Sequence, residues 1–183
     1  MDVLYYFTGS NAVAVGSQAA DAATTAANLT AVGKGAASAL TEGDDNTVIG
    51  TEALDSCLTG AQNTAVGKHA ARSLLGSSNT MVGMNAGYWA TSVDHTVAIG
   101  RDALLGASGA GNVTGDYNIA IGNYSLDATT TGHQNVGIGY QSGSAITTGH
   151  DNVLVGHQAG LALDAQANSV AVGVGALKTE TTS

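Results

Sequence analysis

Short stretches of alternating side chains recur along this chain, and each of them ends in a glycine. Valine or isoleucine stands immediately before every such glycine, and valine, isoleucine or threonine stands two positions earlier. Residues two apart lie on one face of a β-strand, and β-branched side chains favour strands over helices. Each stretch therefore predicts one short strand whose middle residue lies on a second face. The glycines that end these stretches are Gly16, Gly33, Gly50, Gly67, Gly83, Gly100, Gly122, Gly139, Gly156 and Gly173.

These glycines recur with a period of 17 residues, apart from one interval of 16 and one of 22. A fixed period of this kind is the signature of a repeat architecture, in which each copy is one structural unit. Helical repeats would need apolar residues three and four apart, whereas here the period is two and a helix-breaking glycine returns in every copy. We therefore predict an all-β chain that folds as a parallel β-solenoid of about ten 17-residue coils.

A single solenoid domain is expected over residues 11–178, because the repeats leave no room for a linker or a second domain. Residues 1–10 are expected to form an N-terminal lead-in segment, and residues 179–183 a C-terminal tail. The longest interval indicates an insertion near residues 106–115, and repeat proteins place insertions in loops on one face.

Further columns of the repeat describe the rest of the coil. Alanine or serine stands three places after each glycine, and the two residues between them are mostly polar, which indicates a bend that faces outward. A weaker apolar column predicts a second short strand in several coils, through Leu40, Cys57, Leu74, Ile146 and Leu163.

Glycine and asparagine columns mark the turns. Glycines ten places after the end of a stretch predict a backbone with positive φ, and they are Gly43, Gly60, Gly132 and Gly149. Asparagines four places before the stretch-ending glycine predict an amide ladder, in which side chains of successive coils bond to one another and to the turn backbone. These asparagines are Asn46, Asn63, Asn79, Asn118, Asn135 and Asn152.

Composition and charge narrow the function classes. Only 10% of the 183 residues are charged and 44% are hydrophobic, which argues against disorder, and no apolar run is long enough for a membrane helix. The net charge of −9 argues against general nucleic-acid binding. No basic stretch precedes an apolar core near the N-terminus, so no signal peptide is visible. The single cysteine, Cys57, cannot form an intrachain disulfide.

The interior of such a coil would be lined by small residues, mainly alanine and valine. It would bury too little apolar surface to offset the conformational entropy that the chain loses on folding. Association along the rod would supply the missing burial, and a closed three-fold bundle suits a fibre. We therefore predict a homotrimer.

Several of these strings resemble those of known fibrous proteins. NSVAVG at residues 168–173 and NAVAVG at residues 11–16 resemble the head repeats of trimeric autotransporter adhesins. The fuller units, such as NTAVG at residues 63–67 and TGHQN at residues 131–135, resemble repeats in bacteriophage tail fibres. The resemblance covers about residues 11–177. It implies three left-handed parallel β-rolls side by side, in an adhesin head that binds host surfaces or in a fibre that touches the bacterial cell.

Enzymatic chemistry has one candidate. IGTEAL at residues 49–54 and VGKHAA at residues 66–71 resemble a hexapeptide of left-handed β-helix acyltransferases, which use a histidine as general base between subunits. His69 would be that base, but it stands in the variable polar bend. The hexapeptide also occurs once per coil here, where those enzymes repeat it three times. We therefore assign no catalytic residue and no cofactor.

Two histidines form a candidate metal site. His133 and His150 hold equivalent positions in neighbouring coils, and their column continues back through Asp116 and Asp94. Imidazole and carboxylate groups stacked about 4.8 Å apart could ligate a metal ion. A polar turn that faces water explains the same column, because serine and alanine also occur in it. We favour the polar turn and assign no metal.

Two further features are candidate surface contacts. The insertion contains Gly106 and the sequon residues Asn112 and Thr114, and insertions in solenoids often form the binding face. The neighbouring pair Tyr88 and Trp89 offers aromatic rings that suit contacts with a sugar or a protein. The structural alternatives are a neutral bulge for the insertion and a filled coil wall for the aromatic pair.

These observations predict a non-enzymatic, homotrimeric fibre segment of a phage or phage-like particle that mediates or supports attachment to a host cell. Its partners would be its own copies, other fibre or virion proteins and a glycan or protein of the host surface. Neither nucleic-acid binding nor membrane insertion is expected. The protein would be located in the tail or fibre of a virion, or outside the cell on its surface.

Three other functions remain as alternatives. A bacterial adhesin head is the first. A self-assembling extracellular filament is the second, since residues 178–183 stop within a coil and residues 1–7 form no obvious polar cap. An ice-binding solenoid is the third, because flat threonine arrays occur on some solenoids. Against it, the threonine column changes to valine and isoleucine in later coils, and its neighbours indicate a face turned inward. That column contains Thr30, Thr47, Thr64 and Thr80.

Overall fold

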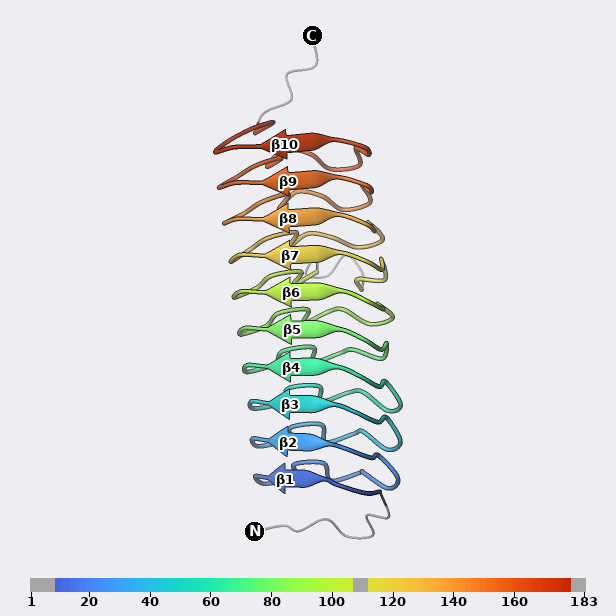
Figure 1. Cartoon of the computed structure of the whole chain (residues 1–183). Coiled ribbons are helices and arrows are strands. Elements are labelled where there is room, and N and C mark those ends of the chain that lie inside the picture. Colours follow the sequence, from blue (N-terminus) through green and yellow to red (C-terminus); the bar gives the residue numbers. More distant parts are fainter. Residues whose placement is uncertain (1–8, 107–111, 179–183) are drawn as a thin grey trace.

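The stretches of alternating side chains are strands in the computed structural model of the chain, which describes residues 9–106 and 112–178. Each strand is three residues long and pairs in parallel with the strands of the coils before and after it, so the sheet follows chain order (Figure 1). No helix occurs in the described ranges, and the predicted all-β parallel solenoid is confirmed. The strands are β1 (Val13–Val15), β2 (Thr30–Val32), β3 (Thr47–Ile49), β4 (Thr64–Val66), β5 (Thr80–Val82), β6 (Val97–Ile99), β7 (Ile119–Ile121), β8 (Val136–Ile138), β9 (Val153–Val155) and β10 (Val170–Val172).

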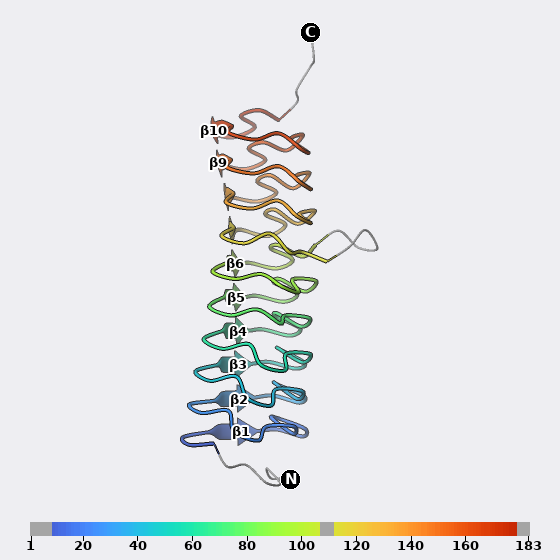
Figure 2. The same ribbon diagram turned by 90° about the vertical axis from the view of Figure 1, so that its right-hand side faces the viewer.

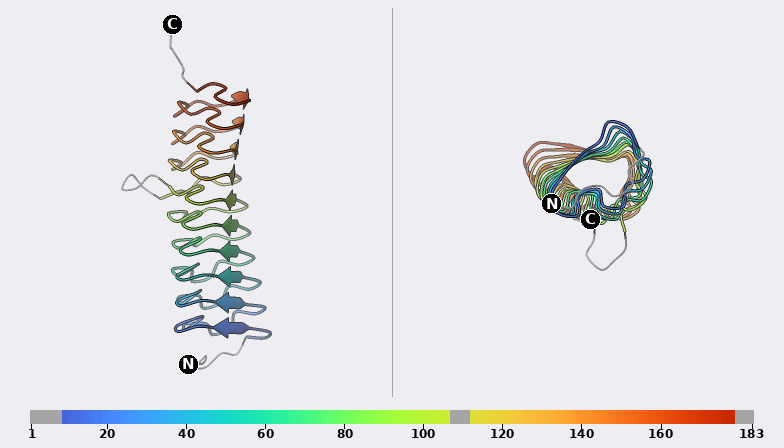
Figure 3. Two further views of the ribbon diagram at one scale, coloured as in Figure 1. Left: turned by 90° about the vertical axis from the view of Figure 1, so that its left-hand side faces the viewer. Right: turned by 90° about the horizontal axis from the view of Figure 1, so that it is seen from below.

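The register of the sheet follows the repeat. Val13 pairs with Thr30 and Thr30 with Thr47, so equivalent residues of successive coils lie in columns along the rod. The longest interval causes no slip, because Val97 of β6 pairs with Ile119 of β7. The sheet occupies one side of the rod (Figure 2), and the coils overlie one another when viewed along its axis (Figure 3).

The threonine column was expected to face the interior of the coil, but in the structure it faces outward. The middle residue of each strand points into the coil, and Ala31, Val48 and Met81 are fully buried. The β-branched residues on either side point outward, with Val15 57% and Val172 68% exposed. The prediction of an inward-facing threonine column is therefore wrong: the uniform β-branched columns form the outer surface of the sheet.

Interior packing is close around the two largest middle residues. Met81 and Leu154 each face a glycine six positions later, because both positions occupy the same narrow interior. A Cβ added to Gly87 would lie 2.6 Å from Met81 Sδ, and one added to Gly160 would lie 2.7 Å from Leu154 Cδ2. In these two coils the middle residue fills the space that a side chain at the later position would need in the close-packed core.

A second strand does not form at the weaker apolar column in the described part of the chain, and that prediction is wrong. The side chains of this column are nevertheless fully buried: Leu40, Cys57, Leu74, Ile146 and Leu163. The backbone before them bends too sharply for a ladder, since residues such as Glu52 and Leu54 have φ of 53° and 49°. On that side the described residues contain one isolated bridge, between Ala90 and Val113.

The turn glycines are required for close approach and not for backbone conformation. Gly43, Gly60, Gly132 and Gly149 do not have positive φ, so that prediction is wrong. A Cβ added to Gly132 would instead lie 2.6 Å from the carbonyl oxygen of Gly149 in the next coil. Adjacent coils therefore touch at these four turns, where a side chain would meet the backbone or side chains of its surroundings.

Candidate functional site

The outer face of the sheet is a surface of uniform composition along the rod. We call it the strand face; it consists of the first and third residues of every strand, and all of them are β-branched. The ten strands that carry it are stacked along the rod (Figure 1). Large apolar members with more than a third of their surface exposed are Val13, Val15, Ile49, Ile99, Ile138, Val153, Val170 and Val172.

The strand face is comparable in size to the largest apolar patches of soluble monomers, which are often functional. Ten strands spaced about 4.8 Å apart, with two columns of side chains, give a patch about 45 Å long and about 10 Å wide. Contiguous apolar patches beyond a few hundred Å² are uncommon on soluble monomers and mark interaction sites. Four threonine hydroxyls in β2 to β5 interrupt an otherwise apolar surface.

The predicted asparagine ladder is confirmed, and it lies inside the coil. Asn46 Nδ2 donates to the carbonyl oxygens of Gly43 and Gly60, at 3.0 and 2.9 Å. Asn46 Oδ1 accepts a hydrogen bond from the backbone N–H of Asn63 at 2.9 Å. The same pattern links Asn118, Asn135 and Asn152, and all are buried. The ladder ties each turn to the next coil, so its role is structural.

Replacing one ladder amide should cost substantial stability. Asn135 is fully buried; its Nδ2 donates to Gly149 O at 2.8 Å and its Oδ1 accepts from Asn152 Nδ2 at 2.9 Å. Asn135→Ala leaves these partners unpaired in the interior, so we expect the free energy of unfolding to fall by about 3 kcal/mol. Thr148→Ala, an exposed position in the following turn, is the control and should change it by less than about 0.5 kcal/mol. Equal losses in denaturant titrations of the two variants would contradict this role.

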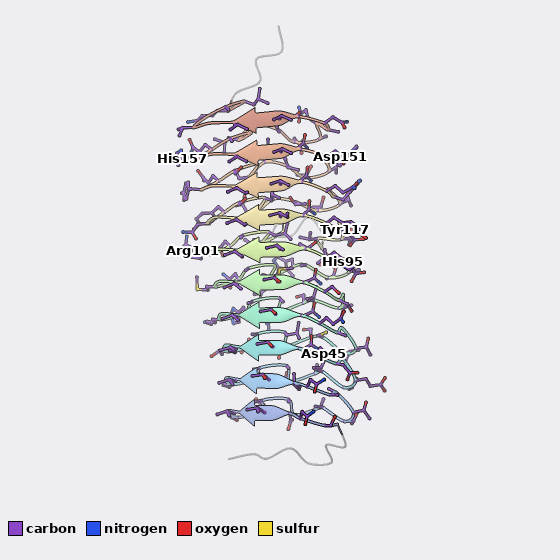
Figure 4. All side chains as sticks on the ribbon, in the orientation of Figure 1. Asp45, His95, Arg101, Tyr117, Asp151 and His157 are labelled. Carbon is purple, nitrogen blue, oxygen red and sulfur yellow. The ribbon has the colours of Figure 1, made fainter. Side chains whose placement is uncertain are left out.

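Polar side chains project from the two corners that flank the strand face (Figure 4). Arg101 and His157 project from the corner at the carboxyl ends of the strands. Asp45, His95 and Tyr117 project from the opposite corner. The residue directly after each stretch-ending glycine is exposed in every coil, which confirms the outward-facing bend.

The first of these corners combines cations with aromatic rings. We call it the cation–aromatic edge. The guanidinium of Arg101 lies 4.8 Å from the centroid of the Tyr124 ring. Tyr124 contacts Tyr140 edge-on at 6.0 Å between centroids, and Tyr140 stacks on His157 at 5.5 Å with 12° between the ring planes. Its members are Lys34, Lys68, Arg101, Tyr124, Tyr140 and His157.

The opposite corner contains the histidine pair. The rings of His133 and His150 stack at 4.9 Å with 8° between their planes, as their register predicts. In the same column, Asp116 Oδ1 accepts a hydrogen bond from the backbone N–H of Asp94 at 2.9 Å. Among the described residues no group of three histidine, cysteine or acidic side chains is placed to hold a metal ion.

His69 and the aromatic pair belong to one half-buried network. His69 Nε2 lies 3.3 Å from Glu52 Oε2, and Arg72 Nη1 donates to the Tyr88 hydroxyl at 2.7 Å. The Tyr88 and Trp89 rings contact each other edge-on at 4.7 Å. The polar partners of this network are all residues of the coil wall. This supports the interpretation that Tyr88 and Trp89 fill the wall. Trp89 still has 38% of its surface exposed.

The insertion is described only at its two ends, because residues 107–111 lie outside the described ranges. Gly106 is buried, and a Cβ there would lie 2.9 Å from both Trp89 Cβ and Val113 Cγ2. Asn112 and Thr114 are exposed on either side of the buried Val113. The flanks of the insertion therefore return to the coil and pack there.

Asp127 is a half-buried acid with an unusual titration. Burial raises its pKa to about 6, and the charge of the nearby Asp102 adds to this effect. Its buried Oδ1 has no hydrogen-bond partner among the described residues. The folded chain therefore holds a proton on this carboxyl more tightly than the unfolded chain does.

The stability of the chain should rise on mild acidification because of Asp127. Between about pH 4 and about pH 6 the folded state binds more protons than the unfolded state, so this group lowers stability as the pH rises. We expect Asp127→Asn to be more stable than the unmodified chain near about pH 8, by on the order of 1 kcal/mol once solvent screening is allowed for. The two should converge near about pH 4.

Asp21→Asn is the matched control, because exposed Asp21 occupies the same position of the first coil. Thermal melts at several pH values should show no gain from Asp21→Asn. A gain of equal size in both variants, or a gain from Asp127→Asn that persists at low pH, would contradict the assignment.

Comparisons with known proteins give no relative for this chain. No protein-family model, no curated protein and no solved structure matches it. None of the described residues forms a helix that is long and apolar enough to cross a membrane.

Proposed function

We propose that this chain is a non-enzymatic fibre segment in which three copies pack through their strand faces, and that it supports attachment of a phage or phage-like particle to a host cell. The observation that carries the proposal is the exposed, β-branched strand face. Packing this face against neighbouring copies would remove it from water and add the apolar burial that a narrow coil lacks.

The pattern of threonines on the strand face supports a parallel arrangement of the copies. An antiparallel pair in full overlap would set Thr30 against Val153 and Thr80 against Val97, which leaves buried hydroxyls opposite apolar side chains. Rotation about an axis along the rod instead sets each threonine near its own counterparts. The number three and the attachment role come from the resemblance to trimeric fibre repeats.

Retention on cells tests the attachment role. Labelled protein would be sedimented with bacterial strains that differ in surface polysaccharide, with unlabelled protein as competitor. Saturable retention that the competitor abolishes, on at least one strain, is the expected result. Uniform, non-saturable retention or none at all across the panel would contradict attachment.

The ice-binding alternative gains one observation from the structure. The threonine column faces outward, which removes the objection based on an inward face. The valines and isoleucines of the other column share that flat surface, however, and they also replace threonine in β6 to β10. An assembly through the strand face would cover the threonines, so a stable monomer is the condition under which ice binding becomes the better proposal.

A further inference from the structure

We propose that the cation–aromatic edge binds a linear polysaccharide of low charge density, with acidic and neutral sugars in alternation, laid along the rod. This deepens the proposed attachment function, on which it rests for its biological setting. The edge lies at a corner beside the strand face, so the inference requires only that this corner stays accessible.

The cations of the edge have a regular spacing. The chain has five lysines and arginines, and three of them, Lys34, Lys68 and Arg101, occupy the position directly after the stretch-ending glycine. They stand in alternate coils, which places neighbouring cations about 10 Å apart along the rod. Carboxylates on every second sugar of an extended polysaccharide recur at a comparable distance. The cations of the edge and the carboxylates of the polysaccharide can therefore stay in register over several repeats.

The lysines of this edge are available to a ligand. Both Lys34 and Lys68 are exposed, and within the described ranges neither forms an ion pair with a carboxylate. Arg101 is held between Asp102, at 3.1 Å, and the ring of Tyr124. Its position is thus fixed before any ligand arrives, which lowers the entropic cost of binding.

Aromatic rings continue the edge beyond the cations. Tyr140 is 44% exposed and stacks on His157, so its ring is held in place while one side remains open. The C–H faces of sugar rings pack on such aromatic surfaces, and the phenol hydroxyl can bond to sugar hydroxyls. The edge therefore has cations toward one end and aromatic rings toward the other. Cations can contact the acidic sugars of a partly acidic glycan, and rings can contact its neutral sugars.

A polar hollow of about 380 Å³ opens beside Lys34. It lies where the second coil has Gly35 and Ser38, at positions where the third coil has Glu52 and Asp55. Carboxylate, hydroxyl, amide and guanidinium groups line this hollow, a combination that can donate to and accept from sugar hydroxyls.

Charge on the rest of the molecule excludes a dense polyanion from this edge. The net charge is −9, and the carboxylates of Glu52 and Asp102 lie one residue further along the chain than the exposed column. A nucleic acid, with a charge on every nucleotide, would meet these carboxylates at short range. A polysaccharide with a neutral sugar between its charges avoids them.

Affinity electrophoresis of the full chain in gels that contain hyaluronan tests the proposal, because this polymer alternates acidic and neutral sugars. Neutral dextran and single-stranded poly(dT) serve as comparison polymers. We expect hyaluronan to retard the chain at low ionic strength, dextran and poly(dT) to leave it unretarded, and added salt to weaken the retardation. Lys68→Gln should weaken binding about five-fold, and Tyr140→Ala about ten-fold.

Matched controls exist for both substitutions. Lys178→Gln removes one exposed lysine outside the edge, and Tyr117→Ala removes an exposed tyrosine that stacks on His95 at the opposite corner. Both should bind hyaluronan like the unmodified chain. Equal weakening by variants and controls, absence of retardation, or equal retardation by poly(dT) would overturn the proposal. The mass of the same sample in solution reports separately on trimer formation, so a trimer that ignores hyaluronan refutes only the edge.

Discussion

Gly67→Ala should destabilise this solenoid by about 4 kcal/mol or more. Gly67 has φ of +131°, which L-residues rarely adopt, and a Cβ there would lie 2.6 Å from the carbonyl oxygen of Gly83 in the next coil. Relieving the clash would require two coils to separate and would break the hydrogen bonds between them. A loss of this size lowers the melting temperature of a chain of this length by roughly 8–16 °C.

Gly173→Ala separates the cost of the backbone conformation from the cost of the clash with the next coil. Gly173 has nearly the same φ, +125°, but nothing lies within 4 Å of a Cβ added there. Only the cost of the backbone conformation remains, so we expect a loss of about 1–2 kcal/mol. If thermal melts gave the two variants the same loss, conformational strain alone would explain the glycine column, and the coil-to-coil contact would not.

Ile138→Asp should dissociate the proposed trimer without unfolding the chain. Ile138 is the last residue of β8 and is 37% exposed on the strand face, so an isolated chain can carry a carboxylate there. In the trimer each copy would bring the same charge into a desolvated interface, at a cost of several kcal/mol per buried ion. The mass in solution should fall to the monomer value of 18.0 kDa while the circular dichroism stays unchanged.

Leu75→Asp is the control for this experiment. Leu75 is 50% exposed and lies outside the strands, so its replacement adds the same charge away from the strand face. It should leave the trimer intact. Dissociation by Leu75→Asp, or a trimer that survives Ile138→Asp, would show that the strand face is not the interface.

The period and the β-branched columns were enough to predict the strands and their parallel order, and the asparagine column was enough to predict the ladder but not its burial. They did not predict which face is buried, because a uniform β-branched column is typical of either a core or an interface. The packing of the structure settles the question, because a Cβ on Gly87 would meet the side chain of Met81. A volume that is shared between two positions indicates that both face the same interior.

Sharp corners explain why the second strand was wrongly predicted. Positions with positive φ recur at non-glycine residues, including Asp45, Leu54 and His69. Asparagine and aspartate at some of them are a usable signal, since these residues adopt that conformation more readily than most. Leucine and alanine at others carry no such signal, because the conformation is imposed by hydrogen bonds to the neighbouring coils.

The cation–aromatic edge was not predicted from the sequence, because its residues lie far apart along the chain. Lys34, Lys68 and Arg101 form no cluster in the sequence, and they become one line only when the coils are aligned by their glycines. The polar bend that contains them was predicted to face outward, and it does. Its continuation by stacked rings depends on side-chain packing between coils, which register alone does not determine.

The mass of the unmodified chain in solution, measured by light scattering over a wide range of concentrations, tests the central claim most directly. The account predicts a fixed mass of three times 18.0 kDa, because three strand faces close on one another and leave none free. A monomer that persists at all concentrations would contradict it and would favour the ice-binding alternative. Growth without limit as the concentration rises would also contradict it, in favour of a filament.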